Sequence, residues 1–256
     1  MKTAVSFPVT GDIISDFKNY ALLNMEEIWD LWQDKTYSPA MNMAIDEALM
    51  LTAELRGRPI LRLYEWDADA VSIGYTQKIA RVPADRGSIV RRPTGGGIVF
   101  HKHHFTYTVV LPNSHWVVKG TKPVESYNWI NRAVQSALKE LEMQSNLAQE
   151  DIPKSVDRAG MVCFVTPTKY DLLSGERKIA GSAQRRAREG MLHQGSIEME
   201  GIDILNASAL RRVLPGGFEE VLKCDFKEFI PFEELMELAL KISKEKYSAE
   251  EWNCKR

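Results

Sequence analysis

The sequence lacks the features that mark secreted and membrane proteins. Its 256 residues include only three cysteines, Cys163, Cys224 and Cys254, which are too widely spaced for a disulfide framework and form no CxxC pair. Few, unpaired cysteines are typical of a reducing compartment, so we expect a cytoplasmic location. No apolar run approaches the roughly 18 residues of a transmembrane helix, and the N-terminus does not have the pattern of a secretory signal. We therefore expect no membrane partner.

A strong excess of charge of one sign is also missing. The 33 basic and 35 acidic residues leave a net charge of −2, and the isoelectric point lies near 6.3. This balance argues against a nucleic-acid partner. Neither the phosphate-binding GxxxxGK(S/T) motif nor the dinucleotide-binding GxGxxG motif occurs. What remains is an ordinary globular composition, with 44% hydrophobic and 27% charged residues.

Hydrophobic periodicity predicts one continuous α/β domain over residues 25–256, preceded by a leader over residues 1–24 whose order the sequence does not define. Strands are predicted over 26–37, 59–66, 70–77, 161–173, 175–186 and 191–199, with another pair on the two sides of a glycine turn within 89–112. Helical spacing is found over 124–141 and again from residue 206 onward.

One helix has clear start and stop signals. Ser38 and Pro39 are typical of an N-cap and a first helical position, and Gly57 is typical of a helix end. The apolar residues between them recur at helical intervals and place Asp46 and Glu47 on the other side of the helix.

Three consecutive glycines, Gly95, Gly96 and Gly97, lie between two predicted strands. Such a run indicates backbone at positive φ or in close approach to a ligand. Arg91 and Arg92 precede the loop and are suited to a phosphate or carboxylate group. The alternative is a hairpin turn with solvated arginines, and the spacing alone does not decide between the two.

Three histidines, His101, His103 and His104, follow the glycine loop. Strand alternation would place His101 and His103 on one face, as in a metal-binding pair. A zinc site needs three or four donors, and no acidic or cysteine ligand lies nearby in the sequence. We therefore predict no metal site and expect surface or hydrogen-bonded histidines.

Cys163 lies in the apolar run MVCFV, where a cysteine usually serves as a small buried hydrophobe. A nucleophilic role needs a nearby cation to stabilise the thiolate. Lys178 follows fifteen residues later, and the two side chains would face each other if their strands paired. Both interpretations remain open at this level.

Lys178 also belongs to a basic stretch that includes Arg177, Arg185, Arg186 and Arg188. We expect these side chains to lie close together. They form either a solvated face or a patch that docks an acidic carrier protein.

Five segments in order resemble the lipoate–protein ligase and octanoyltransferase superfamily: SPAMNMAIDEAL, RRPTGGGIVFH, GERKIAGSAQRR, LHQGSI and YSAEEWN. The resemblance extends from Glu26 to Asn253. It implies a biotin/lipoate-ligase-like α/β (α+β) domain, with a mostly antiparallel mixed sheet flanked by helices. It also implies attachment of a medium-chain or lipoyl acyl group to a lysine of a lipoyl domain, such as glycine cleavage H protein or a dehydrogenase E2 subunit.

The resemblance assigns roles to individual residues. Cysteine-type transferases have a Cys-Phe pair before the KIAGSAQ strand, which implies that Cys163 is the nucleophile, and Lys178 would hold the acyl carbonyl oxygen. The glycine loop would wall the acyl tunnel. The implied substrate-binding residues are Arg91, Arg92, Thr94, Gly95, Gly96, Gly97, His101, Gly181, Ser182, Ala183, Gln184 and His193.

The superfamily contains two mechanisms. Cysteine-type transferases take the acyl group from a thioester, such as that of acyl carrier protein, and need no cofactor. Lipoate ligases activate free lipoate as lipoyl-AMP with ATP and Mg²⁺. Gly97 resembles the ligases, because many cysteine-type transferases have arginine there, and Lys102 departs from both groups, which often have aspartate. We expect a transferase, with the ligase as the alternative.

Two other interpretations are weaker. A non-catalytic module that binds lipoyl domains or acyl groups would keep the glycine loop and lose the catalytic pair, whereas this chain has both Cys163 and Lys178. Biotin ligase is disfavoured by the KIAGSAQ strand.

Overall fold

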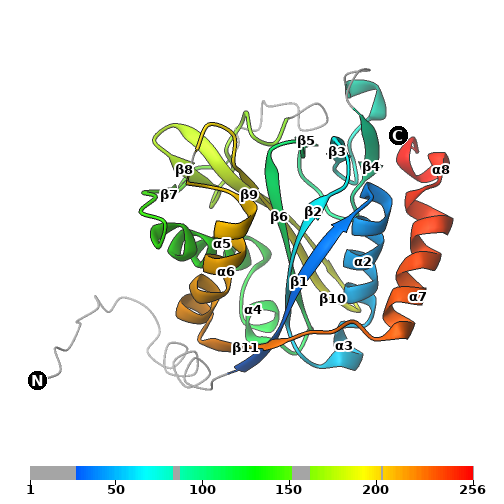
Figure 1. Cartoon of the computed structure of the whole chain (residues 1–256), viewed down its shortest axis with the longest axis horizontal. Helices are drawn as coiled ribbons and strands as arrows, with labels where there is room; N and C mark the ends of the chain where they lie inside the picture. The colour runs from blue at the N-terminus through cyan, green and yellow to red at the C-terminus, as the bar shows by residue number, and fades with distance from the viewer. Residues whose placement is uncertain (1–26, 83–86, 152–161, 203, 256) are drawn as a thin grey trace, which may run out of the picture.

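Strands rich in β-branched and aromatic residues build the main sheet of the computed structural model, which describes residues 27–82, 87–151, 162–202 and 204–255. The predicted leader, residues 1–24, lies outside this part. Eight strands follow in the order β11-β1-β2-β6-β10-β9-β8-β7 (Figure 1). Their bounds are β1 (Glu27–Tyr37), β2 (Ile60–Trp66), β6 (His104–Leu111), β7 (Asn146–Leu147), β8 (Leu172–Ser174), β9 (Arg177–Ala187), β10 (Gly190–Glu198) and β11 (Cys224–Glu228).

The pairing of these strands is mixed but mostly antiparallel. β1 runs parallel to both β2 and β11, and the other neighbours in the sheet are antiparallel. This confirms the predicted fold class. The prediction that the chain is helical from residue 206 onward is wrong for one segment. Strand β11 lies within this region and pairs with β1 at the edge of the sheet.

Helices cover both faces of the main sheet (Figure 1). On one face α5 (Pro123–Lys139) and α6 (Ala207–Leu222) close a large apolar core with the sheet. On the other face α2 (Pro39–Leu51) and α7 (Glu233–Ile242) close a second core. The shorter helical elements are α3 (Ala53–Arg56), η1 (Ile79–Arg81), α4 (Trp116–Lys119), η2 (Ser243–Tyr247) and α8 (Glu250–Asn253). Within the described residues, none of the helices has the length and apolarity to cross a bilayer.

A second, three-stranded sheet lies beside the end of the main sheet. Its order is β4 (Ser88–Arg91), β3 (Ala70–Ile73) and β5 (Val99–Phe100). The glycine loop connects β4 to β5, which do not pair with each other because β3 lies between them. The hairpin alternative for this loop is therefore wrong. The loop instead packs on Gly74, where an added Cβ would lie 2.1 Å from the Gly96 carbonyl oxygen.

The predicted boundaries of the first helix are confirmed. The Ser38 hydroxyl accepts a hydrogen bond from the Met41 amide, and Pro39 is the first residue of α2. Gly57 ends α3 in the left-handed conformation, with φ of 68°. The prediction that Asp46 and Glu47 face away from the core is wrong, because both are buried.

Asp46 is buried because it belongs to an ion-pair network around Arg62 of β2, whose side chain is also inaccessible. The Arg62 guanidinium lies 2.7 Å from Asp46 and 2.8 Å from Asp34, and it donates to the side-chain oxygen of Asn42. The second oxygen of Asp46 accepts from a ring of polar groups: Tyr64, Thr108 and Gln194. This network joins α2 to strands β1, β2, β6 and β10.

Arg62→Met should lower the free energy of unfolding by about 3–5 kcal/mol, because it leaves two buried carboxylates without their cation. Urea unfolding of both proteins measures the difference. The matched control is Lys102→Met, which breaks an exposed pair with Asp69 at 3.4 Å and should cost no more than about 1 kcal/mol. Equal losses in the two variants would contradict a structural role for the network.

Candidate active site

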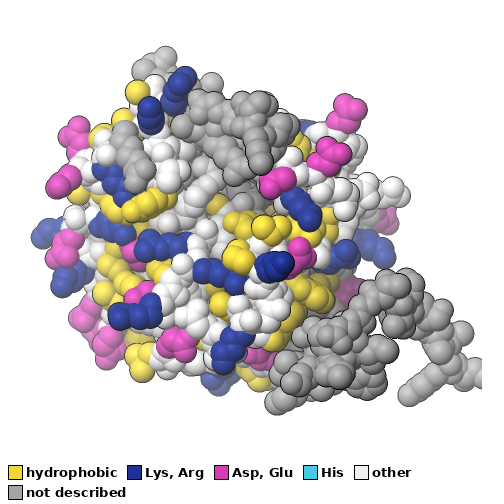
Figure 2. Space-filling model, turned by 180° about the vertical axis from the view of Figure 1, so that it is seen from behind, with side chains coloured by type: hydrophobic (Ala, Val, Ile, Leu, Met, Phe, Trp, Pro, Cys, Tyr) yellow, Lys and Arg dark blue, Asp and Glu magenta, His cyan; other side chains and the backbone are white. Residues whose placement is uncertain are grey.

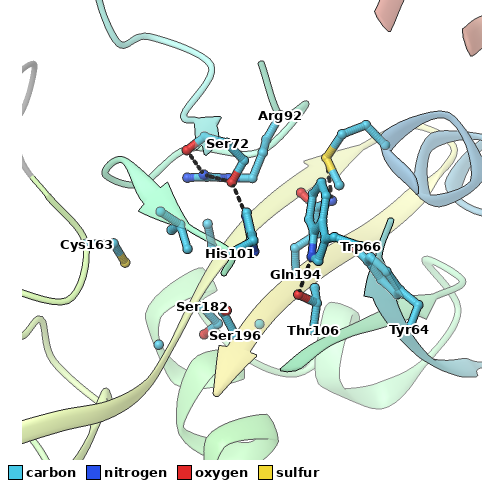
Figure 3. Close-up of a pocket in the computed structure, with 15 residues that line it drawn as sticks. Tyr64, Trp66, Ser72, Arg92, His101, Thr106, Cys163, Ser182, Gln194 and Ser196 are labelled. Atoms are coloured by element: carbon cyan, nitrogen blue, oxygen red, sulfur yellow. Dashed lines mark hydrogen bonds between the residues drawn. The ribbon is translucent and has the colours of Figure 1, made fainter. Parts of the chain in front are cut away.

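A narrow cavity lies between the small sheet and the adjoining face of the main sheet (Figure 3). Its volume is about 30 Å³. Figure 3 places Cys163 at one end and Trp66 and Tyr64 at the other. The remaining lining residues are Met43, Ser72, Arg92, Val99, His101, Thr106, Gly181, Ser182, Ala183, Gln194, Gly195 and Ser196.

Cys163 and Lys178 meet at the end of this cavity, although not as paired strands. Residues 161–173 were predicted as one strand, but Cys163 lies in a turn and β8 begins only at Leu172. The Cys163 amide donates to the Ile98 carbonyl at 2.9 Å, which fixes the turn on the small sheet. The cysteine is 9% exposed.

The Lys178 ammonium lies beside this end of the cavity, behind Cys163 and Gly181, and donates to three acceptors. They are the Cys163 carbonyl oxygen at 2.8 Å, the Cys163 Sγ at 3.4 Å and Asp171 Oδ2 at 2.7 Å. Burial alone would lower the pKa of Lys178, but the negative charges of Cys163 and Asp171 outweigh it and raise that pKa. A buried, protonated lysine therefore lies directly against the cysteine sulfur.

Glycine at position 181 makes room for this lysine. Lys178 folds back along β9, and a Cβ added at Gly181 would lie 2.4 Å from Lys178 Cε and 2.6 Å from its Nζ. Because the ammonium is held by three acceptors, it cannot move away without losing them. The family resemblance implies that Gly181 binds substrate. In the structure, its missing side chain leaves the space that the Lys178 side chain occupies.

Arg92 is a second buried cation on the cavity wall. Its guanidinium donates to Ser72 and to the carbonyl oxygens of Gly95 and Gly97, all neutral groups. Burial lowers the pKa of Arg92 to about 10, opposed by the negative charge of Cys163. The glycine loop thus holds Arg92 in place from behind, while the cavity surface itself is formed by the arginine.

Arg91, next in sequence, has a different role from the one implied. Its guanidinium donates to backbone carbonyls of Gly74, Tyr75, Gln77 and Asn253 and does not line the cavity. Its own carbonyl accepts from the Trp252 indole. Arg91 was expected to contact substrate. In the structure it instead connects β4 to the C-terminal YSAEEWN segment.

Strand alternation divides the other predicted residues between two faces. Ala183 of β9 and Gln194 of β10 face the cavity, and Gln194 accepts from Thr94 of the glycine loop at 2.7 Å. Gln184 and His193 point to the opposite face, where Gln184 accepts from Ser126 of α5.

His193 is completely buried between two tyrosine rings on that opposite face. Burial lowers the pKa of His193 to about 3, so the ring is neutral. The implied substrate contacts of Gln184 and His193 therefore do not match their positions, because both side chains lie behind the sheet.

The three histidines after the loop also separate. His101 lines the cavity, stacks on Trp66 with ring centroids 4.0 Å apart, and lies 2.6 Å from the Ser72 hydroxyl. His103 is exposed and faces Glu200. In the part of the chain that the structure describes, His, Cys, Asp and Glu form no group of three that could hold a metal ion.

The predicted clustering of basic residues is wrong. Lys178 and Arg186 lie near opposite ends of β9, roughly 26 Å apart at about 3.3 Å per residue. Arg186 donates to carbonyls of Val118 and Thr121. On the face seen from behind, basic and acidic side chains are interspersed (Figure 2).

Sequence reasoning missed Asp171 and several cavity residues, among them Ser72, Thr106, Gln194 and Ser196. Asp171 had a usable signal, because it lies seven residues before Lys178 across the Gly175 turn. In the resulting hairpin, Leu173 pairs with Lys178, which brings a carboxylate near the lysine.

A family model described as the lipoyl protein ligase A/B catalytic domain matches residues 38–227. The chain belongs to this family. The predicted family is thereby confirmed. Octanoyltransferase LipM of Staphylococcus epidermidis is 37% identical over 192 residues, which cover 70% of this chain and 68% of the relative.

Solved structures of lipoate ligases resemble the whole fold. A putative lipoate protein ligase from Thermoplasma acidophilum has a TM-score of 0.74 and 27% identity, covering 91% of this chain and all of that one. A lipoate-protein ligase A bound with ATP has a TM-score of 0.74 and 26% identity, covering 90% of this chain and 99% of that one.

Gly181→Ala should lower turnover about 100-fold, because displacing a reacting group by about 1 Å has an effect of that size. Steady-state turnover and melting temperature, measured on the same preparation, separate loss of activity from loss of fold. The control is Gly216→Ala in α6, where the added methyl meets only the far end of the Glu140 side chain. Full activity in Gly181→Ala would show that Lys178 does not need its observed position.

Proposed function

We propose that this chain is an octanoyltransferase that carries the acyl group on Cys163 and delivers it to a lysine of a lipoyl-domain protein. The observation that carries the proposal is the buried Lys178 ammonium 3.4 Å from the Cys163 sulfur. The naming of relatives such as that of Staphylococcus epidermidis supports octanoyl as the group transferred.

In the first step the Cys163 thiolate attacks the carbonyl carbon of an octanoyl thioester, with acyl carrier protein as the donor. A tetrahedral oxyanion forms and collapses, the carrier thiolate leaves, and a new thioester remains on Cys163. Lys178 stabilises negative charge first on the sulfur and then on the oxyanion. One thioester replaces another, so this step needs no ATP.

In the second step the neutral amine of the acceptor lysine attacks the Cys163 thioester. The tetrahedral intermediate expels the Cys163 thiolate, and the nitrogen gives its proton to solvent as the amide forms. Because an amide is much more stable than a thioester, the second step drives the transfer forward. The free thiol on which the cycle depends fits the proposed cytoplasmic location.

The cavity next to Cys163 suits an apolar chain that is held by its carbonyl end. The end distant from Cys163 contains Trp66 and Tyr64, and Gln194 there lies 3.3 Å from the sulfur of Met43. A volume of about 30 Å³ holds about two water molecules. An octanoyl chain therefore has to displace lining side chains, and the unbranched Met43 is the one best able to move.

Mixing the protein with octanoyl carrier protein in the absence of nucleotide should add one octanoyl group to Cys163. Intact-mass analysis and peptide mapping locate it. Cys224 should stay unmodified, because burial raises the pKa of that thiol to about 12, so Cys224→Ser serves as the matched control for Cys163→Ser. Acylation elsewhere, or undiminished transfer by Cys163→Ser, would rule out the cysteine mechanism.

The alternative is a lipoate ligase, which the ligase-like Gly97 and the ATP-bound structural relative favour. In that case the protein would use free lipoate, ATP and Mg²⁺ and release pyrophosphate. A pyrophosphate assay with free lipoate and free octanoate distinguishes the two activities directly. A non-catalytic module would give neither pyrophosphate nor an acyl-enzyme.

Lys178→Ala should lower the rate of transfer about 100- to 1000-fold, the effect of removing one oxyanion donor. Lys178→Arg should not restore it, because a planar guanidinium does not fit the space of a compact ammonium beside Gly181. Single-turnover rates, with thermal melting to check the fold, test both variants. Near-normal turnover in Lys178→Ala would remove the central charge from the proposed site.

A further inference from the structure

The Asp171 carboxylate is fixed by hydrogen bonds in addition to its ion pair with Lys178. Its Oδ2 accepts from the Thr168 amide at 2.6 Å, the Thr168 hydroxyl at 2.9 Å and the Lys178 ammonium at 2.7 Å. Its backbone is fixed as well, since its amide donates to Thr168 and its carbonyl accepts from Ala148. Only 2% of the residue is exposed.

The charges around Lys178 change during the proposed cycle. In the resting enzyme two anions can support the buried ammonium, the Cys163 thiolate and the Asp171 carboxylate. Once Cys163 carries an acyl group its sulfur is a neutral thioester, so Asp171 is the remaining anion in contact with Lys178. Burial without a counter-charge drives a lysine to lose its proton. The second half of the reaction therefore depends on Asp171 more than the first.

We propose that Asp171 is a positioning residue that keeps Lys178 protonated and directed at Cys163, above all while Cys163 is acylated. This inference rests on the proposed function, because it assumes an acyl-enzyme. It assigns the carboxylate no contact with substrate. Asp171 acts through Lys178, which supplies the hydrogen bond to the oxyanion formed when the acceptor amine attacks.

The titratable groups near Lys178 have pKa values that leave a range around neutral pH in which they do not change charge. Arg92 is cationic below about pH 10, burial raises the pKa of Tyr127 to about 12, and burial also raises the pKa of Tyr107. His104 packs on the Phe164 ring, and burial lowers its pKa to about 4. Between pH 6.5 and 9, therefore, Arg92 stays cationic while His104 and Tyr127 stay neutral, and none of these three groups changes charge.

The experiment compares the two half-reactions of wild type and Asp171→Asn from pH 6.5 to 9. Acylation is followed by intact mass with octanoyl carrier protein, and transfer is followed by mixing isolated acyl-enzyme with an unmodified lipoyl domain. In the variant, Lys178 loses its proton at a lower pH than in wild type once Cys163 is acylated, because the Asp171 charge that raises its pKa is absent. The ratio of wild-type to variant transfer rate should then grow with pH, by at most about tenfold for each pH unit. Taking ratios cancels the titration of the acceptor amine.

Two further variants complete the test. Asp171→Glu keeps the charge and should lower both rates by a factor that does not change with pH, so a pH-dependent loss there contradicts the proposal even if Asp171→Asn does not fold. Asp30→Asn is the matched control, because Asp30 is also buried and pairs with Arg58. It lies on β1, four strands from β9, and should leave both profiles unchanged.

A ratio for Asp171→Asn that is flat with pH, or a loss confined to acylation, would overturn the proposal and leave Asp171 as a structural residue. Failure of the proposed function gives a different result, since wild-type protein would then form no acyl-enzyme with octanoyl carrier protein. The two failures are therefore distinguishable in the same set of reactions.

Discussion

The buried pairing of Arg62 with Asp46 and Asp34 is the interaction on which the position of the cavity depends. Removing three charges from water is costly, and the cost is offset only when nearly every polar atom has a partner. Here Arg62 uses both carboxylates and Asn42, and the remaining oxygen of Asp46 is filled by hydroxyl and amide groups. One of these, Gln194, is also part of the cavity wall.

Through Gln194 the network extends to the second sheet, because Thr94 of the glycine loop donates to the same side chain. The main sheet, α2 and the small sheet are thus connected by one chain of hydrogen bonds beneath the cavity. Asp171 and Lys178 are brought together by the hairpin of β8 and β9, and Cys163 lies shortly before this hairpin in the sequence. Arg92 reaches the cavity from the other sheet, and its position depends on the long-range contacts.

Sequence-based predictions were reliable where a residue's own backbone preference determines the structure, as at the ends of helices. Ser38, Pro39 and Gly57 act through their own backbone geometry, and they bound the first helical region as predicted. The family motifs also located the fold and the neighbourhood of Lys178. β11 was missed because a short edge strand between two helices has little periodicity of its own.

What the sequence could not reveal is which neighbour each side chain meets. Arg91 and Arg92 are chemically identical and adjacent, yet one ties backbone segments together and the other lines the cavity. Asp46 was expected on an outer face, because the helical pattern does not show that an arginine from β2 lies opposite it. His193 and Gln184 were assigned by motif, and the alternation of β9 and β10 placed them behind the sheet.

The contact of Arg91 with α8 makes Trp252 and Asn253 part of what supports the candidate site. Trp252 and Asn253 provide acceptors for the Arg91 guanidinium, and Asn253 also accepts from the Arg91 amide. Removing these two residues would take acceptors from a buried guanidinium and free the end of β4, one residue before Arg92.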